Sequence, residues 1–69
     1  MQVEGIVETF DEYRGDGFLV SDTGERLYFH CVSIADGSRN IPVGVRANGE
    51  RSVGRVGRDE VVRLQYAQD

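Results

Sequence analysis

Short alternations of apolar and polar residues, interrupted by turns, run along most of the chain. The segment QVEGIVETF, residues 2–10, is rich in β-branched residues and predicts a first strand, in which Gly5 marks a bulge or a close backbone contact. GFLVS at 17–21 and LYFHC at 27–31 predict two more strands, and DTGE at 22–25 predicts the hairpin turn between them. No segment keeps a helical period over three turns, so strands dominate the prediction.

The second half of the chain divides less clearly. VSIADGSRN, residues 32–40, predicts one helical turn followed by a long loop. IPVGVRA, residues 41–47, predicts a fourth strand that starts after its proline, and DEVVRLQYA, residues 59–67, predicts a fifth. Five short strands without a substantial helix predict a small all-β barrel.

The dipeptide Asn48-Gly49 conflicts with a single fourth strand. It is the strongest two-residue signal for a β-hairpin, and it would split this part of the chain into GVRA and ERSV, giving six strands. The alternative is a bulge or a local irregularity inside one long strand. We favour the bulge.

Alternation along the second and third predicted strands separates an inward set from an outward set. The inward side chains are Leu19, Leu27 and Phe29. The outward side chains are Phe18, Tyr28 and His30, with Asp16 beside them. Two large aromatic side chains on an outer face are not explained by burial, unless the loop at 33–40 covers them. Flat rings on neighbouring strands form a platform for unstacked bases, each stack contributing about 1–3 kcal/mol. Arg14, just before the second strand, is placed to meet a phosphate or to stack on a base.

Charge is unevenly distributed over the 69 residues, a length typical of one domain. All eight basic residues are arginine, and the net charge is −4. Residues 1–30 hold two arginines against seven acidic residues, and residues 31–69 hold six against five, so their net charges are −5 and +1. The acidic total argues against strong non-specific coating of DNA, which depends on neutralising phosphates. It does not exclude single-strand binding, in which stacking supplies much of the energy.

The sequence also bears on the compartment of the protein. The single cysteine, Cys31, excludes an internal disulfide and fits a reducing compartment. Residues 1–10 lack the basic and apolar regions of a signal peptide. We therefore expect a cytoplasmic protein without a membrane span, in which the Arg-Gly-Asp triplet at 14–16 has no adhesion role.

The neighbouring residues His30 and Cys31 raise the question of a thiol–imidazole pair. Adjacent residues of a strand point to opposite faces, so we expect that these side chains do not share a proton. One histidine and one cysteine also fall short of the ligand set of a structural zinc site. Cys31 is better explained as a small, partly buried apolar residue. Because no nucleophile–base set occurs elsewhere in the sequence, we expect no enzymatic activity, cofactor or metal.

Three segments of the chain resemble the bacterial cold-shock domain family. EGIVETFDEYRGDGFLV matches the family's first strand and its first ribonucleoprotein motif, which normally reads Lys-Gly-Phe-Gly-Phe-Ile. RLYFHCVSI matches the second motif, normally Val-Phe-Val-His-Phe, and IPVGV falls where the family enters its fourth strand. The resemblance extends from Gly5 to about Leu64 and is poor after Val45. It implies a small five-stranded antiparallel OB-type barrel that binds single-stranded nucleic acid.

Five positions match residues with a role in the family, and four other positions depart from the family pattern. Its stacking residues correspond to Phe18, Tyr28 and His30, its basic residue to Arg14, and the aromatic residue that closes the first strand to Phe10. The departures are Glu8 for a lysine, Thr9 for a stacking tryptophan, Asp16 for a stacking phenylalanine and Cys31 for another phenylalanine. With about 1–3 kcal/mol lost for each missing stack, affinity is expected to fall by orders of magnitude. Arg39 and Arg58, in flanking loops, are candidates to assist a narrower site.

We therefore expect residues 1–69 to form one domain that binds single-stranded RNA or DNA weakly and with low sequence specificity, as an RNA chaperone or a regulator of gene expression. The alternative is a barrel that has lost nucleic-acid binding and serves as a protein-interaction or regulatory module. GRVGRD, residues 54–59, either grips a phosphate or is a solvated loop. We expect a monomer, although the edges of a partly open barrel leave dimerisation open.

Overall fold

The computed structural model describes residues 1–35, 37, 40–53 and 59–66, which form five strands and one short helix. The strands are β1 (Gln2–Asp11), β2 (Asp16–Ser21), β3 (Arg26–His30), β4 (Arg46–Val53) and β5 (Asp59–Tyr66). A 3₁₀ helix, η1 (Cys31–Ser33), follows β3 directly and confirms the predicted helical turn. No helix in the described part of the chain is long and apolar enough to span a bilayer.

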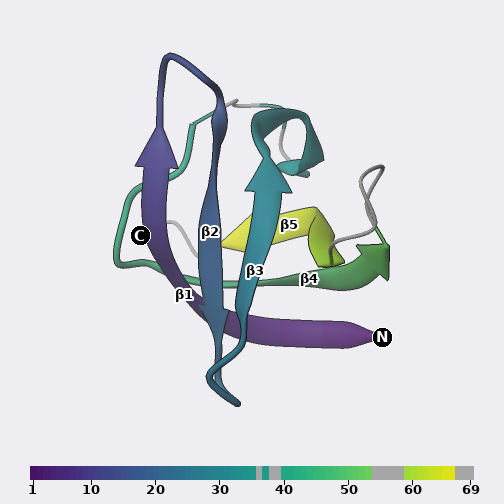
Figure 1. Ribbon diagram of the computed structural model, residues 1–69. Coiled ribbons are helices and arrows are strands. Elements are labelled where there is room, and N and C mark those ends of the chain that lie inside the picture. The colour runs from purple at the N-terminus through teal and green to yellow at the C-terminus, as the bar shows by residue number, and fades with distance from the viewer. Residues whose placement is uncertain (36, 38–39, 54–58, 67–69) are drawn as a thin grey trace.

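The strands close into a barrel in the order β1-β2-β3-β5-β4, as Figure 1 shows. The predicted five-stranded OB-type barrel is therefore confirmed, with one difference in strand direction. β3 and β5 are parallel and meet through Tyr28 and Glu60, whereas the other four pairings are antiparallel. A parallel pair needs a long crossover connection, which the chain between β3 and β5 provides.

β1 belongs to both halves of the barrel because it bends. Its residues 2–6 pair with β4, and residues 5–11 pair with β2. Gly5 lies where the two pairings overlap, and a Cβ atom at this position would collide with the carbonyl oxygen of Val20. The predicted close backbone contact at Gly5 is confirmed.

A bulge in β1 changes which side chains face outward near its end. Val7 pairs with Leu19 and Thr9 pairs with Phe18, so two steps along β1 match one step along β2, and Glu8 is the extra residue. Val7 is fully buried, whereas Thr9 is exposed beside Phe18. Without the bulge, the alternation would turn Thr9 to the same side as Val7.

The fourth strand begins later than predicted but is not split. Residues 41–45 are not part of a strand, because Pro42 has no N–H to donate and the chain turns at Gly44, which has a φ of 93°. β4 then runs without a break through Asn48-Gly49, so the hairpin is excluded and the irregularity is confirmed.

The extra residue at this irregularity lies on β5. Asn48 pairs with Gln65 and Glu50 with Val62, so two steps along β4 match three along β5. Arg63, within this stretch, has a φ of 53°, in the left-handed region that most residues avoid. Gly49 opposes the bulge, and a Cβ atom there would lie 2.6 Å from Cγ1 of Val61.

The core contains the side chains that alternation placed inward. Leu19 and Phe29 are fully buried and Leu27 is 2% exposed. The other buried apolar residues are Val7, Ile34, Ile41, Ala47, Val61 and Leu64. Phe10 packs its ring parallel to that of Phe29, with the ring centroids 5.9 Å apart.

Candidate nucleic-acid interface

The outer face of β2 and β3 carries two aromatic side chains next to each other. Phe18 pairs with Tyr28 in the strand register, and Asp16 pairs with His30. All four side chains are half-buried. The ring centroids of Phe18 and Tyr28 are 5.9 Å apart, and the ring planes meet at 73°. The two rings are adjacent and reach solvent as predicted, but they form an edge-to-face step rather than a flat platform.

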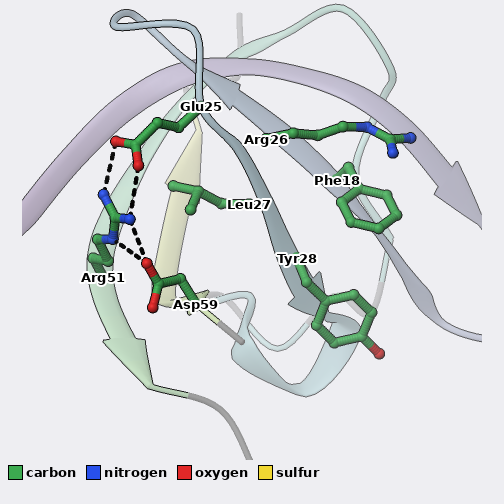
Figure 2. A pocket seen from close by; sticks show the side chains of 7 residues that line it. All are labelled: Phe18, Glu25, Arg26, Leu27, Tyr28, Arg51 and Asp59. Atoms are coloured by element: carbon green, nitrogen blue, oxygen red, sulfur yellow. Dashed lines mark hydrogen bonds and ion pairs between the residues drawn. The ribbon is translucent and has the colours of Figure 1, made fainter. Parts of the chain in front are cut away.

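One face of Phe18 is covered by an arginine from the neighbouring strand. The guanidinium carbon of Arg26 lies 4.0 Å from the centroid of the Phe18 ring, and Figure 2 shows the two side chains together. Nε of Arg26 donates a hydrogen bond of 2.6 Å to Oε1 of Glu8. The bulge in β1 makes Glu8 the unpaired residue, and such a residue is free to turn toward a neighbouring strand. Arg26 thus contacts both Phe18 and Glu8, and its guanidinium covers part of the candidate site.

Asp16 organises the other side of the aromatic pair. The hydroxyl of Tyr28 donates to Oδ2 of Asp16 at 3.0 Å, and a guanidinium nitrogen of Arg14 lies 3.4 Å from the same oxygen. Arg14 is held by the turn before β2, in which Oδ1 of Asp11 accepts hydrogen bonds from the backbone N–H groups of Tyr13 and Arg14. The predicted basic residue is therefore next to the aromatic pair, but it is already paired with a carboxylate.

Two hollows flank the aromatic pair and share Phe18 and Tyr28. The first has a volume of about 240 Å³ and is also lined by Thr9, Phe10, Asp11, Arg14, Asp16 and Gly17. The second has a volume of about 490 Å³ and is also lined by Glu25, Arg26, Leu27, Arg51 and Asp59, as Figure 2 shows. A chain of bases that crosses Phe18 and Tyr28 has room on both sides.

Arg51 forms the far wall of the second hollow. Its two terminal nitrogens each bond a carboxylate oxygen of Glu25 at 2.7 Å, and it also bonds Asp59 (Figure 2). The hydrogen bonds from Arg51 lower the pKa of Glu25 below its ordinary value, and the same bonds raise the pKa of Arg51. This cation is therefore held in place by two acidic residues of β5 and of the β2–β3 turn.

His30 and Cys31 are closer than strand alternation predicted. The strand ends at His30, and Cys31 begins η1, so the rule of opposite faces does not apply to this pair. Sγ of Cys31 lies 3.8 Å from Nδ1 of His30, and the same nitrogen accepts a hydrogen bond from the backbone N–H of Val32 at 3.3 Å. Cys31 is half-buried and packs against the core, as expected of a small apolar residue.

Of the three remaining predicted site residues, the structure describes only Phe10. Phe10 lines the first hollow while its ring packs on the core residue Phe29. Arg39 and Arg58 lie outside the described residues, as does most of the 54–59 segment. In the described part of the chain, no cluster of three or more His, Cys, Asp or Glu side chains is suited to hold a metal ion.

Sequence reasoning missed two arginines of the candidate site, Arg26 and Arg51, which line the second hollow. Arg26 had a signal in the sequence, because residues 26, 28 and 30 alternate onto one face of β3. Arg51 had none, because its place depends on how β4 packs beside β5 and the β2–β3 turn.

Comparison with known proteins bears on the fold. No family model matches the chain, and no curated protein matches it. A solved structure described as Drosophila Unr CSD456, a cold-shock domain structure, superposes with a TM-score of 0.77 at 23% sequence identity. The fold is that of a cold-shock domain. The match covers 99% of this chain and 27% of that one, so the chain spans about a quarter of the protein it resembles.

Proposed function

We propose that this barrel binds single-stranded nucleic acid, RNA or DNA, across the outer face of β2 and β3. The observation that carries the proposal is the pair of half-buried rings on adjacent strands, 5.9 Å apart, with a hollow on each side. Aromatic rings on an OB-type barrel stack with bases of any sequence, because every base has a π-face. His30 extends the face along β3, and Arg14 supplies a cation beside it.

The proposed binding is weak and low in sequence specificity. A ligand on Phe18 must compete with the guanidinium of Arg26, and a phosphate near Arg14 must compete with the carboxylate of Asp16. All five arginines in the described part of the chain are paired with acidic side chains in this way. Few cations are therefore available to release counterions from a nucleic acid, so we expect a shallow dependence of affinity on salt.

The test compares a labelled ten-nucleotide single strand of mixed sequence with the same strand in a duplex, by fluorescence anisotropy. We expect the single strand to bind more tightly, because only unpaired bases offer their faces. Tyr28→Leu removes the ring and should weaken binding about tenfold, whereas Tyr28→Phe keeps the ring and should bind within about twofold of the natural protein. Equal loss in both variants, or preference for the duplex, would contradict the proposal.

The second candidate is a protein-interaction or regulatory module. The ion pairs Glu8–Arg26 and Arg14–Asp16 favour it, because they occupy the face with charges that oppose a phosphate chain. This candidate predicts protein partners that remain bound after nuclease treatment and are lost with Tyr28→Leu. Partners that disappear with nuclease would leave nucleic-acid binding as the function.

A further inference from the structure

The first hollow beside Phe18 and Tyr28 combines aromatic residues with a carboxylate. Its volume of about 240 Å³ lies below the range of about 300–1,000 Å³ that is typical of pockets for drug-sized ligands, so one base fits it better than a larger group. Its lining combines the aromatic residues Phe10, Phe18 and Tyr28 with the charged residues Asp11, Arg14 and Asp16.

The carboxylate of Asp16 has one oxygen committed and one oxygen unused. The Tyr28 hydroxyl and Arg14 both contact Oδ2. Within the described residues, no contact engages Oδ1, and no buried polar side-chain atom lacks a partner, so Oδ1 is in contact with solvent. The Asp16 side chain as a whole is only 15% exposed. Because Asp16 also lines the first hollow, a fixed acceptor with one unused oxygen lies beside the space that a base would occupy.

An ionised carboxylate accepts hydrogen bonds and donates none. Cytosine, adenine and guanine carry exocyclic amino groups that donate to such an acceptor. Uracil and thymine offer a single N–H, and its two flanking carbonyl oxygens repel a carboxylate. Single strands expose these base edges to protein side chains.

We propose that Asp16 makes the first hollow selective for bases with an exocyclic amino group over uracil and thymine. This inference rests on the proposed single-strand binding and assigns its base preference. The negative charge of Asp16 is balanced locally by Arg14, whose side chain is 73% exposed and keeps further N–H donors for a passing phosphate. Selection and phosphate contact can thus come from one ion pair.

The experiment measures the affinity of the protein for heptamers of deoxycytidine and deoxyuridine at pH 7. These bases have the same ring size and differ only in the amino or carbonyl group at position 4 and in the neighbouring ring nitrogen. The natural protein should bind the cytidine heptamer about tenfold more tightly, the size of one charge-assisted hydrogen bond. Asp16→Asn, in which the side chain both donates and accepts, should bind the two heptamers equally.

The matched control is Glu50→Gln, which removes one negative charge from a residue that lines neither hollow, and it should retain the preference. Equal binding of both heptamers by the natural protein would overturn the inference while leaving single-strand binding intact. Binding of neither heptamer would overturn the proposed function itself. A preference for cytidine that persists in Asp16→Asn would overturn the role of Asp16. If Asp16→Asn does not fold, Asp16→Ala, which lacks the carboxylate, takes its place and should also bind the two heptamers equally.

Discussion

The contact of Glu8 with Arg26 determines how readily one face of Phe18 can be reached. Arg26 lies 4.0 Å above that ring and is held by a 2.6 Å hydrogen bond to Glu8. An exposed cation–π contact contributes about 0.5–1 kcal/mol, and an exposed ion pair contributes about 0.2–1 kcal/mol. A base that stacks on this side must therefore overcome about 1–2 kcal/mol in total.

Glu8→Gln removes the ion pair but keeps the size of the side chain. Losing about 0.2–1 kcal/mol of competition corresponds to about 1.5- to 5-fold in affinity, and the loss of a negative charge close to the aromatic face acts in the same direction. We expect affinity for a single strand to rise about two- to fivefold. The assay is a titration by fluorescence anisotropy in about 0.1 M salt, where exposed charges are partly screened.

Glu50→Gln is the matched control for Glu8→Gln. Glu50 is half-exposed and bonds Arg63 at 2.7 Å, so the substitution removes the same charge and a similar ion pair away from the aromatic face. It should change affinity by less than the Glu8 variant. If both variants gain equally, the effect comes from net charge alone, and if Glu8→Gln binds more weakly, the reasoning about Phe18 is refuted.

Three further predictions concern stability, each measured by urea unfolding. Arg63 has a φ of 53°, so Arg63→Gly should be about 1 kcal/mol more stable than Arg63→Ala. Both variants lose the same side chain, and only glycine adopts this conformation freely. Equal stabilities of the two variants would contradict backbone strain at this position. A Cβ atom at Gly17 would collide with the carbonyl oxygen of Thr9, so Gly17→Ala should destabilise by at least about 2 kcal/mol, and a neutral effect would contradict the close pairing of β1 and β2. The pKa of Glu25 is lowered by hydrogen bonds from Arg51. As the pH falls, the Glu25 carboxylate is therefore protonated in the unfolded chain before it is protonated in the folded protein. The stabilisation from Glu25 is complete above the ordinary carboxyl pKa of about 4 and is lost as the pH falls through the lower pKa of the folded protein. Arg51→Gln should therefore lose less stability between neutral pH and pH 3 than the natural protein. An equal loss would argue against the Glu25–Arg51 pair.

Local alternation predicted the parts of the fold that depend on neighbouring residues. The period of two along β2 and β3 placed Leu19 and Phe29 in the core and Phe18 and Tyr28 outside, because the buried and exposed faces of a strand are set within a few residues. The same rule failed where the strand ended. It separated His30 from Cys31, whereas η1 begins at Cys31 and brings the two side chains to 3.8 Å.

Features that depend on distant segments were not accessible from the sequence. Ile41 is buried but lies outside β4, although it belongs to the segment, residues 41–47, that predicted the fourth strand. Its apolar side chain was a sign of burial and not of strand pairing. The parallel contact of β3 with β5 depends on how the barrel closes. Arg26 meets Glu8 across 18 residues of chain, and Glu8 is the extra residue of a bulge in β1 that no local pattern marked.

The most direct test of the account maps where a single strand contacts the protein. Backbone amide resonances of isotopically labelled protein are followed by NMR during titration with a mixed-sequence single-stranded decamer. The account predicts that the largest shifts fall in β2 and β3, around Phe18 and Tyr28, with smaller shifts near Arg14. Shifts confined to β4 and β5, or no shifts at millimolar ligand, would contradict the claim that this aromatic face binds nucleic acid.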